Sequence, residues 1–251
     1  VSCEGVVPLC ARFDTVGPLA RNVEDAALAL AAIEGGRAAD LRGASLKGAR
    51  FAALQTVVMD DLREGPEAAH AAAIATLREA GAVIDEIAAP EVAEAMPLSP
   101  VLYTGEAYGL WRDEIEAAPE KMFAPILERF RGGKAFSAAD YVAAWRKIDS
   151  LRAAWHARVA GYDAVLMPAA PNLPPDQARL MRDDEYYVTE NLLTLRNTRV
   201  GNLMGLCAVT LPTGVPSCGI MLCGKPNQEE RLLRVAAAAE AALGGGMAAE
   251  N

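Results

Sequence analysis

The feature that most constrains the fold is a strand–helix–strand pattern early in the chain. Residues 50–55 are mostly apolar and predict a strand, which residues 57–58 extend. Pro66 then opens a helix that ends at Gly81, and residues 82–87 form the next strand. Because parallel strands are joined by long crossovers, usually a helix, this unit predicts a sheet covered by helices.

Later segments add three more strands to the predicted sheet. Residues 163–168 are continuously apolar, as in strands buried on both faces of a parallel or mixed sheet. Two short strands follow at residues 207–211 and 219–222, joined by a Pro- and Gly-containing turn. The pattern contains no internal repeat and no linker, and 251 residues suit one large domain better than two average ones. We therefore expect one α/β domain with a central mixed β-sheet covered by helices.

Helix signals fill the intervening stretches. Asn22 is a typical N-cap for a helix that ends at Gly35. The predicted apolar face of that helix consists of Leu28, Leu30 and Ile33. Residues 92–136 have a helical but less regular pattern. Ser137 and Asp140 form a predicted capping box that starts a long helix.

Two more helices are expected nearer the C-terminus, at residues 187–204 and 228–243. A glycine run at residues 244–246 follows the last of them. It succeeds a helix rather than a strand, so we interpret it as a tail and not as a phosphate-binding loop.

Composition and charge exclude several classes of protein. The chain carries a net charge of −9, which argues against a nucleic-acid-binding face, and it contains no apolar run long enough to cross a membrane. Its first residues have neither the basic start nor the apolar core of a signal peptide. Five cysteines in a chain of this length suggest reduced thiols, so we expect a cytoplasmic protein.

The common catalytic and metal-binding patterns are missing from the sequence. His70 and His156 lie in helical segments without His or Cys at ligand spacing, so we interpret both as solvated helix-face residues. No G-x-S-x-G, P-loop or dinucleotide motif is present. The acidic clusters at residues 60–61 and 183–185 are interpreted as solvated loops. We therefore predict no metal and no cofactor.

One segment is too specific to be generic. The stretch FDTVGPLARNVEDAA at residues 13–27, preceded by GVVPL at residues 5–9, resembles the downstream end of the amidase signature. Two later segments agree in order with the same family. YDAVLMPAAP at residues 162–171 is similar to its late strand and loop, and NLMGLCAVTLPTG at residues 202–214 resembles a further motif, with Cys207 in place of the usual proline. The resemblance covers essentially the whole chain.

The resemblance implies amide hydrolysis by a serine nucleophile, assisted by a second serine and a lysine, with backbone N–H groups forming an oxyanion hole. In the family these groups precede the segment that begins at Gly5. Ser2 lies too far downstream to match the nucleophile, and Lys47 matches no catalytic lysine. We therefore expect residues 1–251 to be the C-terminal part of a single amidase-signature domain. Its α/β/α sandwich would be incomplete at the N-terminal side, and the chain alone would be inactive.

Candidate site residues fall into two groups. Residues expected near a small amide substrate follow the nucleophile segment or lie in the variable helical region and late loop: Leu9, Phe13, Tyr103, Tyr108, Trp111 and Pro171. Structural roles are expected for the motif residues: Gly5, Asp14, Thr15, Gly17, Pro18, Arg21, Asn202, Gly205 and Gly214. Asp14 is expected to accept backbone N–H bonds at the Gly17–Pro18 turn, and Arg21 to pair with an oxygen there.

Two other interpretations remain open. The chain could be a non-catalytic subunit or scaffold paired with a chain that carries the nucleophile. It could also be a transamidase-type subunit that handles aminoacyl-tRNA, although the acidic balance weighs against direct RNA binding. Members of the resembled family are often dimers, so a homodimer also stays open.

Overall fold

The computed structural model describes residues 1–244 and contains a five-stranded mixed sheet. The glycine run predicted as a tail continues outside the described residues at Gly245 and Gly246. The strand order is β2-β1-β3-β5-β4, in which β1 pairs in parallel with β2 and β3, and β5 pairs antiparallel with β3 and β4. The strands are β1 Arg50–Leu54, β2 Val83–Ile87, β3 Ala164–Pro168, β4 Cys207–Pro212 and β5 Gly219–Gly224. The mixed sheet predicted from the sequence is confirmed.

Side chains along the central strands point alternately to the two faces of the sheet, and this divides the core into two layers. In β1, Phe51 and Ala53 face one hydrophobic cluster, whereas Ala52 and Leu54 face the other. β3 is buried at every position, and its Val165 and Leu166 divide between the clusters in the same way. Since successive side chains of a strand point to opposite faces, a strand buried throughout needs helices on both faces.

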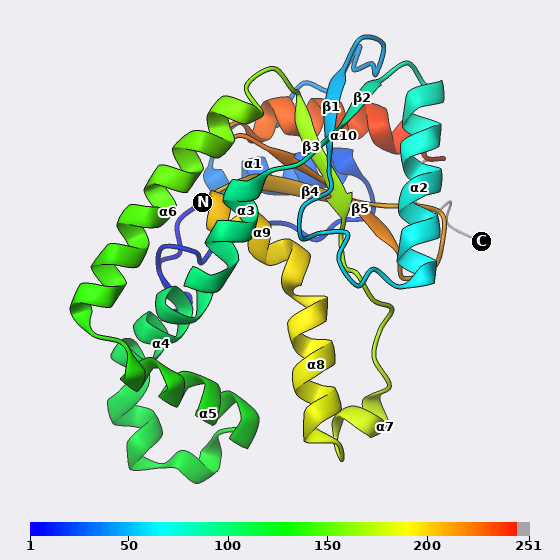
Figure 1. Cartoon of the computed structure of the whole chain (residues 1–251). Helices are drawn as coiled ribbons and strands as arrows, with labels where there is room; N and C mark the ends of the chain where they lie inside the picture. Colours follow the sequence, from blue (N-terminus) through cyan, green and yellow to red (C-terminus); the bar gives the residue numbers. More distant parts are fainter. Residues whose placement is uncertain (245–251) are drawn as a thin grey trace.

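The two helical layers are visible in Figure 1. One cluster is covered by α1 Val23–Glu34, α2 Glu64–Glu79 and α10 Glu229–Ala242. The other is covered by α3 Pro90–Ala95, α4 Ser99–Ala117, α6 Ala138–Arg158 and α9 Arg196–Met204. The α/β/α arrangement expected from the sequence is therefore present.

The remaining helices extend away from the sheet. In Figure 1, α4 and α5 run downward from the sheet on one side, and α8 and α7 do so on the other. These helices are α5 Ala124–Arg131, α7 Gln177–Leu180 and α8 Asp184–Thr194. Short 3-10 turns join α3 to α4, α4 to α5 and α5 to α6, at η1 Met96–Leu98, η2 Pro119–Lys121 and η3 Gly132–Ala135. The predicted irregularity of residues 92–136 reflects these interruptions.

Helix ends follow the predicted capping residues. The Asn22 side chain accepts the Asp25 N–H at 2.7 Å, and Gly35 ends α1 in the left-handed conformation with φ 71°. Ser137 and Asp140 form the complete capping box of α6. Asp183 belongs to an acidic cluster for which the sequence predicts a solvated loop, but it caps α8 by accepting the Tyr186 N–H.

Some local predictions are wrong. Residues 57–58 do not extend β1, because Val57 adopts a positive φ of 69° and the chain turns there. The single helix predicted at residues 187–204 is two helices that meet at Leu195. The apolar face of α1 is made by Val23, Ala27 and Ala31, whereas Leu28 and Ile33 are exposed.

His70 is the clearest correction among the polar residues. It lies on the buried side of α2 with 5% of its surface exposed, and its Nδ1 has no hydrogen-bond partner among the described residues. Burial lowers the pKa of His70 to about 4, so the ring is neutral at neutral pH. His70 is therefore a core residue and not a solvated one.

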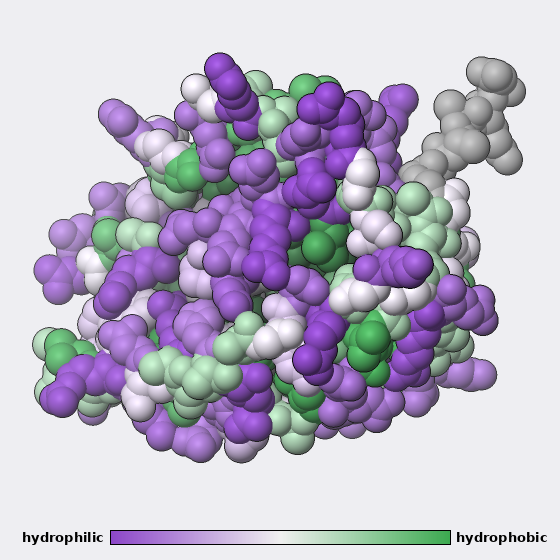
Figure 2. Space-filling view, turned by 90° about the horizontal axis from the view of Figure 1, so that it is seen from above, coloured by the Kyte–Doolittle hydropathy of each residue, from purple (hydrophilic) through white to green (hydrophobic). Residues whose placement is uncertain are grey.

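The surface carries few continuous apolar areas on the face drawn in Figure 2, where hydrophilic side chains dominate and hydrophobic ones form separate patches. Within residues 1–244, every helix is too short or too polar to pass through a lipid bilayer.

Candidate functional site

The motif that follows Gly5 folds into a tight turn at residues 9–14. The Asp14 carboxylate accepts the N–H groups of Leu9 at 2.9 Å and of Cys10 at 3.1 Å, and the Asp14 N–H bonds to the Cys10 carbonyl at 2.8 Å. Asp14 thus braces the turn before it and not the Gly17–Pro18 segment, so the predicted direction is wrong. The physical reason is that residues 14–20 contain no turn or bend for Asp14 to cap.

Glu106 of α4 fixes this turn to the helical layer. Its carboxylate accepts the Ala11 N–H at 2.6 Å, the Cys10 thiol at 3.2 Å and the Tyr141 hydroxyl of α6 at 2.6 Å. Burial, followed by the bond to Glu106, raises the pKa of Cys10 to about 12. Cys10 is therefore a protonated thiol that donates a hydrogen bond, and it is not an activated nucleophile.

Aromatic rings hold the far side of the turn. Phe13 is buried, stacks on Tyr103 of α4 with ring centroids 4.6 Å apart and lies 5.0 Å from the ring of Trp145 in α6. The Arg12 guanidinium covers Trp145, 3.8 Å from its centroid. Asn202 of α9 donates to the Tyr103 hydroxyl at 2.9 Å. Turn 9–14 thus contacts α4 and α6, and α9 reaches the same place through Tyr103.

The structure brings four of the six predicted substrate residues to this turn. Phe13 and Tyr103 stack, and Trp111 donates its indole N–H to the Pro8 carbonyl at 2.7 Å, beside the exposed Leu9. Substrate contact at these positions stays a prediction.

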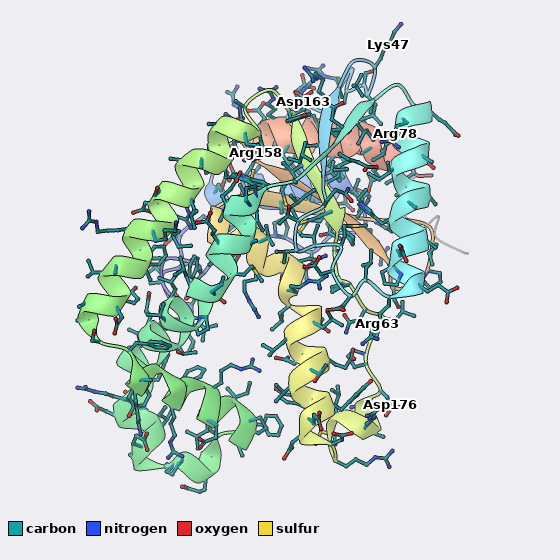
Figure 3. All side chains as sticks on the ribbon, in the orientation of Figure 1. Lys47, Arg63, Arg78, Arg158, Asp163 and Asp176 are labelled. Carbon is teal, nitrogen blue, oxygen red and sulfur yellow. The ribbon has the colours of Figure 1, made fainter. Side chains whose placement is uncertain are left out.

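The other two predicted residues lie elsewhere. Tyr108 points to a different side of α4, where it bonds to Glu116 at 3.2 Å and lies under Lys134. Pro171 is buried, and its carbonyl accepts the Arg63 N–H at 2.9 Å. Figure 3 shows Arg63 beside the loop that leads to α7. Helical spacing explains Tyr108, because positions 103 and 108 are too far out of phase to share one helix face.

A shallow groove lies on the solvent side of Glu106. It has a volume of about 340 Å³ and lies between α4 and the start of α6. Its lining consists of Gly105, Glu106, Gly109, Leu110, Phe136, Ser137, Ala138 and Tyr141. Glu106 and Tyr141, which are hydrogen-bonded to each other behind turn 9–14, therefore also form part of an open surface.

The motif glycines adopt the backbone conformations expected of turn residues. Gly205 ends α9 with φ 68°, and a Cβ there would lie 3.2 Å from the Arg152 guanidinium carbon. Gly214 and Gly5 also have positive φ, at 84° and 81°. Arg152 donates to the carbonyls of Leu203 and Asn202, so it binds the C-terminal end of α9.

Other motif residues differ from expectation. Thr15, Gly17 and Pro18 lie in a segment without helix, strand or turn, and a Cβ added to Gly17 would contact nothing within 4 Å. Arg21 is exposed and forms no ion pair or hydrogen bond within residues 1–244, so the predicted pairing is wrong for this structure. Its neighbour Asn22 provides the local hydrogen bond at the helix start instead.

A buried asparagine joins the carboxyl ends of the two central parallel strands. Asn197 is fully buried and donates to the Pro168 carbonyl at 2.8 Å and the Val58 carbonyl at 3.2 Å. It therefore fixes α9 across the ends of β1 and β3. Ligands of open α/β sheets commonly bind at this edge.

Sequence reasoning missed Glu106, Tyr141 and Trp145 as site residues. One feature of the sequence could have indicated Glu106. It lies four residues after Leu102 and three after Tyr103, on the apolar side of α4. An acidic residue at such a position needs a hydrogen-bonding partner. No sequence signal could identify that partner, since Ala11 lies 95 positions earlier.

Within the described part of the chain, no three His, Cys, Asp or Glu side chains gather closely enough to hold a metal ion. The cysteines of residues 1–244 are all free thiols.

Comparison with known proteins identifies the family. A family profile described as Amidase matches residues 1–233. The 2-amino-5-chloromuconic acid deaminase of Comamonas testosteroni is 30% identical over 98% of this chain and 54% of its own length. A glutamyl-tRNA(Gln) amidotransferase subunit of Staphylococcus epidermidis is 29% identical over 94% of this chain and 56% of its own length. The chain therefore spans about half the length of these curated relatives.

The fold agrees with solved structures as well. A crystal structure described as an amidase superposes with a TM-score of 0.82 and 22% identity, covering 97% of this chain and 56% of that one. At that identity the likeness concerns the fold. The profile match over residues 1–233 shows that the chain belongs to the amidase family.

Proposed function

We propose that this chain works in the hydrolysis of a carboxylic amide, cleaving the C–N bond to release an acid and ammonia or an amine. The observation that carries the proposal is the match of the Amidase profile to residues 1–233, nearly the whole chain. Residues 1–251 would form part of a single amidase-signature domain, and the structured N-terminal turn would be one wall of its substrate pocket.

The proposed substrate contacts are those that the fold gathers at this turn. Leu9 is exposed there, and Trp111 lies beside it through its bond to Pro8. Phe13 and Tyr103 form the aromatic floor. An apolar wall with a few polar groups suits a small organic amide, because apolar contacts bind its body and polar groups orient it.

We propose that the nucleophile comes from a further segment or a partner chain. Within residues 1–244, no hydrogen bond joins a serine hydroxyl to a lysine amine: Ser137 bonds to Asp140, and Lys147 bonds to Glu94. In the resembled family a serine oxygen attacks the amide carbonyl and forms an ester, the protonated amine leaves, and water hydrolyses the ester to the acid. Backbone N–H groups stabilise the oxyanion formed in each step.

A second candidate has specific support. A relative with nearly the same identity is described as a component of a glutamyl-tRNA(Gln) amidotransferase. A chain of that kind would pass ammonia to an acceptor and not release it. The two candidates differ in a direct measurement, since hydrolysis gives free ammonia without any acceptor.

The test compares the 251-residue chain with the complete product of its native gene, copurified with any bound partner. Ammonia release from benzamide, succinamate and glutamine is followed with a coupled assay. We expect turnover by the gene product or its complex and none by the 251-residue chain alone. Consumption of glutamine only when an aminoacyl-tRNA acceptor is supplied, with the nitrogen recovered in the amidated acceptor and not as free ammonia, would favour the amidotransferase candidate. Absence of turnover under all these conditions would contradict both.

A further inference from the structure

The groove between α4 and the first turn of α6 is distinct from the proposed substrate contacts, because none of the six residues predicted to contact substrate lines it. Its volume of about 340 Å³ lies within the range of small-molecule sites. Two apolar side chains form part of its wall: Leu110, with 46% of its surface exposed, and Phe136, with 37%. The groove thus offers an apolar surface that is open to solvent.

Small residues keep the groove open. Gly105, Gly109 and Ala138 line it, and both glycines lie inside α4, where glycine is less favourable than alanine because it loses more backbone freedom. A Cβ at Gly105 would touch the Tyr141 ring at 3.8 Å, whereas a Cβ at Gly109 would meet nothing within 4 Å. Packing among residues 1–244 therefore does not require a glycine at position 109, but a larger side chain there would fill the groove.

The one carboxylate that lines the groove has no cationic partner. Within the described residues, Glu106 forms no ion pair, whereas the buried Glu91 pairs with Arg158 at 2.6 Å and the buried Glu190 pairs with Arg63 at 3.2 Å. The donors to Glu106 are neutral: the Ala11 N–H, the Cys10 thiol and the Tyr141 hydroxyl. They occupy three of about four acceptor positions of a carboxylate, so its negative charge and one position remain available.

Other charges at the groove leave it negative. Its lining contains neither lysine nor arginine among the residues that the structure describes. The N-terminal end of α6 reaches the groove through Ser137 and Ala138 and carries the partial positive charge of the helix dipole. The Asp140 carboxylate offsets that charge, because it accepts the Ser137 N–H at 2.9 Å and the Ser137 hydroxyl at 2.7 Å.

Tyr141 adds a second acceptor beside Glu106. Its hydroxyl donates to Glu106 at 2.6 Å, so its oxygen is still able to accept a hydrogen bond. Burial, followed by the bond to Glu106, raises the pKa of Tyr141 to about 12, and the hydroxyl therefore keeps its hydrogen at neutral pH. Tyr141 and Phe136 also bring two aromatic rings to the groove, and the faces of such rings attract cations.

We propose that this groove binds a small organic ammonium ion with an apolar body, such as a protonated primary amine. The ammonium group would donate to the Glu106 carboxylate and the Tyr141 oxygen, in hydrogen bonds strengthened by charge. The apolar body would lie over Gly109, between Leu110 and Phe136. Since Glu106 also holds Ala11, the ligand would contact the side chain that fixes turn 9–14. The proposal rests on the groove and its charge, and it does not depend on the proposed amide hydrolysis.

The experiment measures binding and needs no turnover. Benzylamine, which is protonated at neutral pH, and benzyl alcohol, its neutral counterpart of the same size, are titrated by calorimetry into the 251-residue chain. Gly109→Leu fills the groove and leaves the bonds of Glu106 in place, and Glu106→Gln removes the charge. Glu114→Gln is the matched control, because it removes a charge from an exposed position of the same helix. Thermal unfolding of each variant shows whether it is folded.

We expect benzylamine to bind at least about tenfold more tightly than benzyl alcohol, as for one charge-assisted hydrogen bond or more, and to bind more weakly as the salt concentration rises. Gly109→Leu should lower the affinity for benzylamine at least about tenfold. Glu106→Gln should abolish the preference for the charged probe, and Glu114→Gln should change neither result. No benzylamine binding, equal binding of the two probes, or undiminished binding by a folded Gly109→Leu chain would overturn the proposal. Gly109→Leu decides the question even if Glu106→Gln fails to fold.

Discussion

At the scale of single residues, the candidate site depends on a few hydrogen bonds that span long sequence separations. Glu106 alone connects turn 9–14 with α4 and α6 through Ala11, Cys10 and Tyr141. Its bonds are short, at 2.6 Å to both Ala11 and Tyr141, and charge-assisted, so each is stronger than a neutral one. The position of the turn should therefore respond to this one side chain.

Replacing Glu106 by Gln tests that role. The glutamine side chain keeps the shape of glutamate but has only one acceptor oxygen. It can therefore keep only one of the short bonds to Ala11 and Tyr141, and its NH₂ group faces the other donor. We expect a loss of about 1–3 kcal/mol in the free energy of unfolding, measured by urea denaturation. Glu114→Gln, on an exposed position of the same helix, should change stability by less than about 0.5 kcal/mol. Equal effects of the two substitutions would contradict the assigned role of Glu106.

His70 gives a prediction on pH dependence. Burial lowers the folded-state pKa from 6.5 to about 4, so protonation favours the unfolded chain. The stability that the neutral ring permits is fully present above pH 6.5 and is lost as the pH falls through 4. Relative to a His70→Leu variant, the native chain should lose roughly 3 kcal/mol over this interval. Parallel stability curves for the two chains between pH 7 and 4 would show that His70 is not buried as described.

Residue identity predicts local bonds better than long-range ones. The Asn22 and Ser137 caps could be predicted because the partner lies three residues away. The burial of His70 could not, since α2 is rich in alanine and offers no sharp apolar face from which to orient it. The Glu106 contacts depend on tertiary packing that a single sequence does not encode locally.

At the scale of elements, α4 and η3 approach each other unusually closely. A Cβ at Gly133 would overlap the Thr104 carbonyl oxygen and lie 2.7 Å from the Tyr108 Cβ. These contacts involve backbone and the stem of a side chain, so neither can move away without shifting the helix. The contact holds the helical extension formed by α4 and α5 together.

Gly133→Ala tests this contact. We expect a loss of at least about 1–3 kcal/mol in unfolding free energy, the usual cost of overpacking. The adjacent Gly132→Ala is the matched control, because a Cβ there meets nothing within 4 Å and alanine favours helical backbone. Thermal unfolding of both variants checks the prediction, and a Gly133→Ala chain as stable as Gly132→Ala would show that the helices are farther apart.

The strands and most helices could be predicted from hydrophobic period and capping residues, but the break at Leu195 could not. α9 must turn there so that Asn197 can reach the carbonyls of Pro168 and Val58. That requirement comes from the ends of two strands distant in sequence. Helical periodicity continues across the break and so conceals it.

At the scale of the whole molecule, the mixed sheet separates two helical layers, and the candidate site lies in only one of them. Turn 9–14, α4, α6 and α9 all belong to the layer that contains Phe13, Trp145 and Leu203. The fold class could be predicted because the buried strands and the amidase-like motifs both indicate it. The proposed pocket could be predicted in part, since four of six substrate residues gather at the turn.

The proposal for the whole molecule is that this chain supplies the substrate wall of an amide-hydrolysing site, with the nucleophile provided by a further segment or chain. The decisive experiment follows ammonia release from succinamate, both for the native gene product with its partners and for the 251-residue chain alone. We predict turnover by the former and none by the latter. Turnover by the 251-residue chain alone, or no turnover by the native gene product on any amide tested, would refute the proposal.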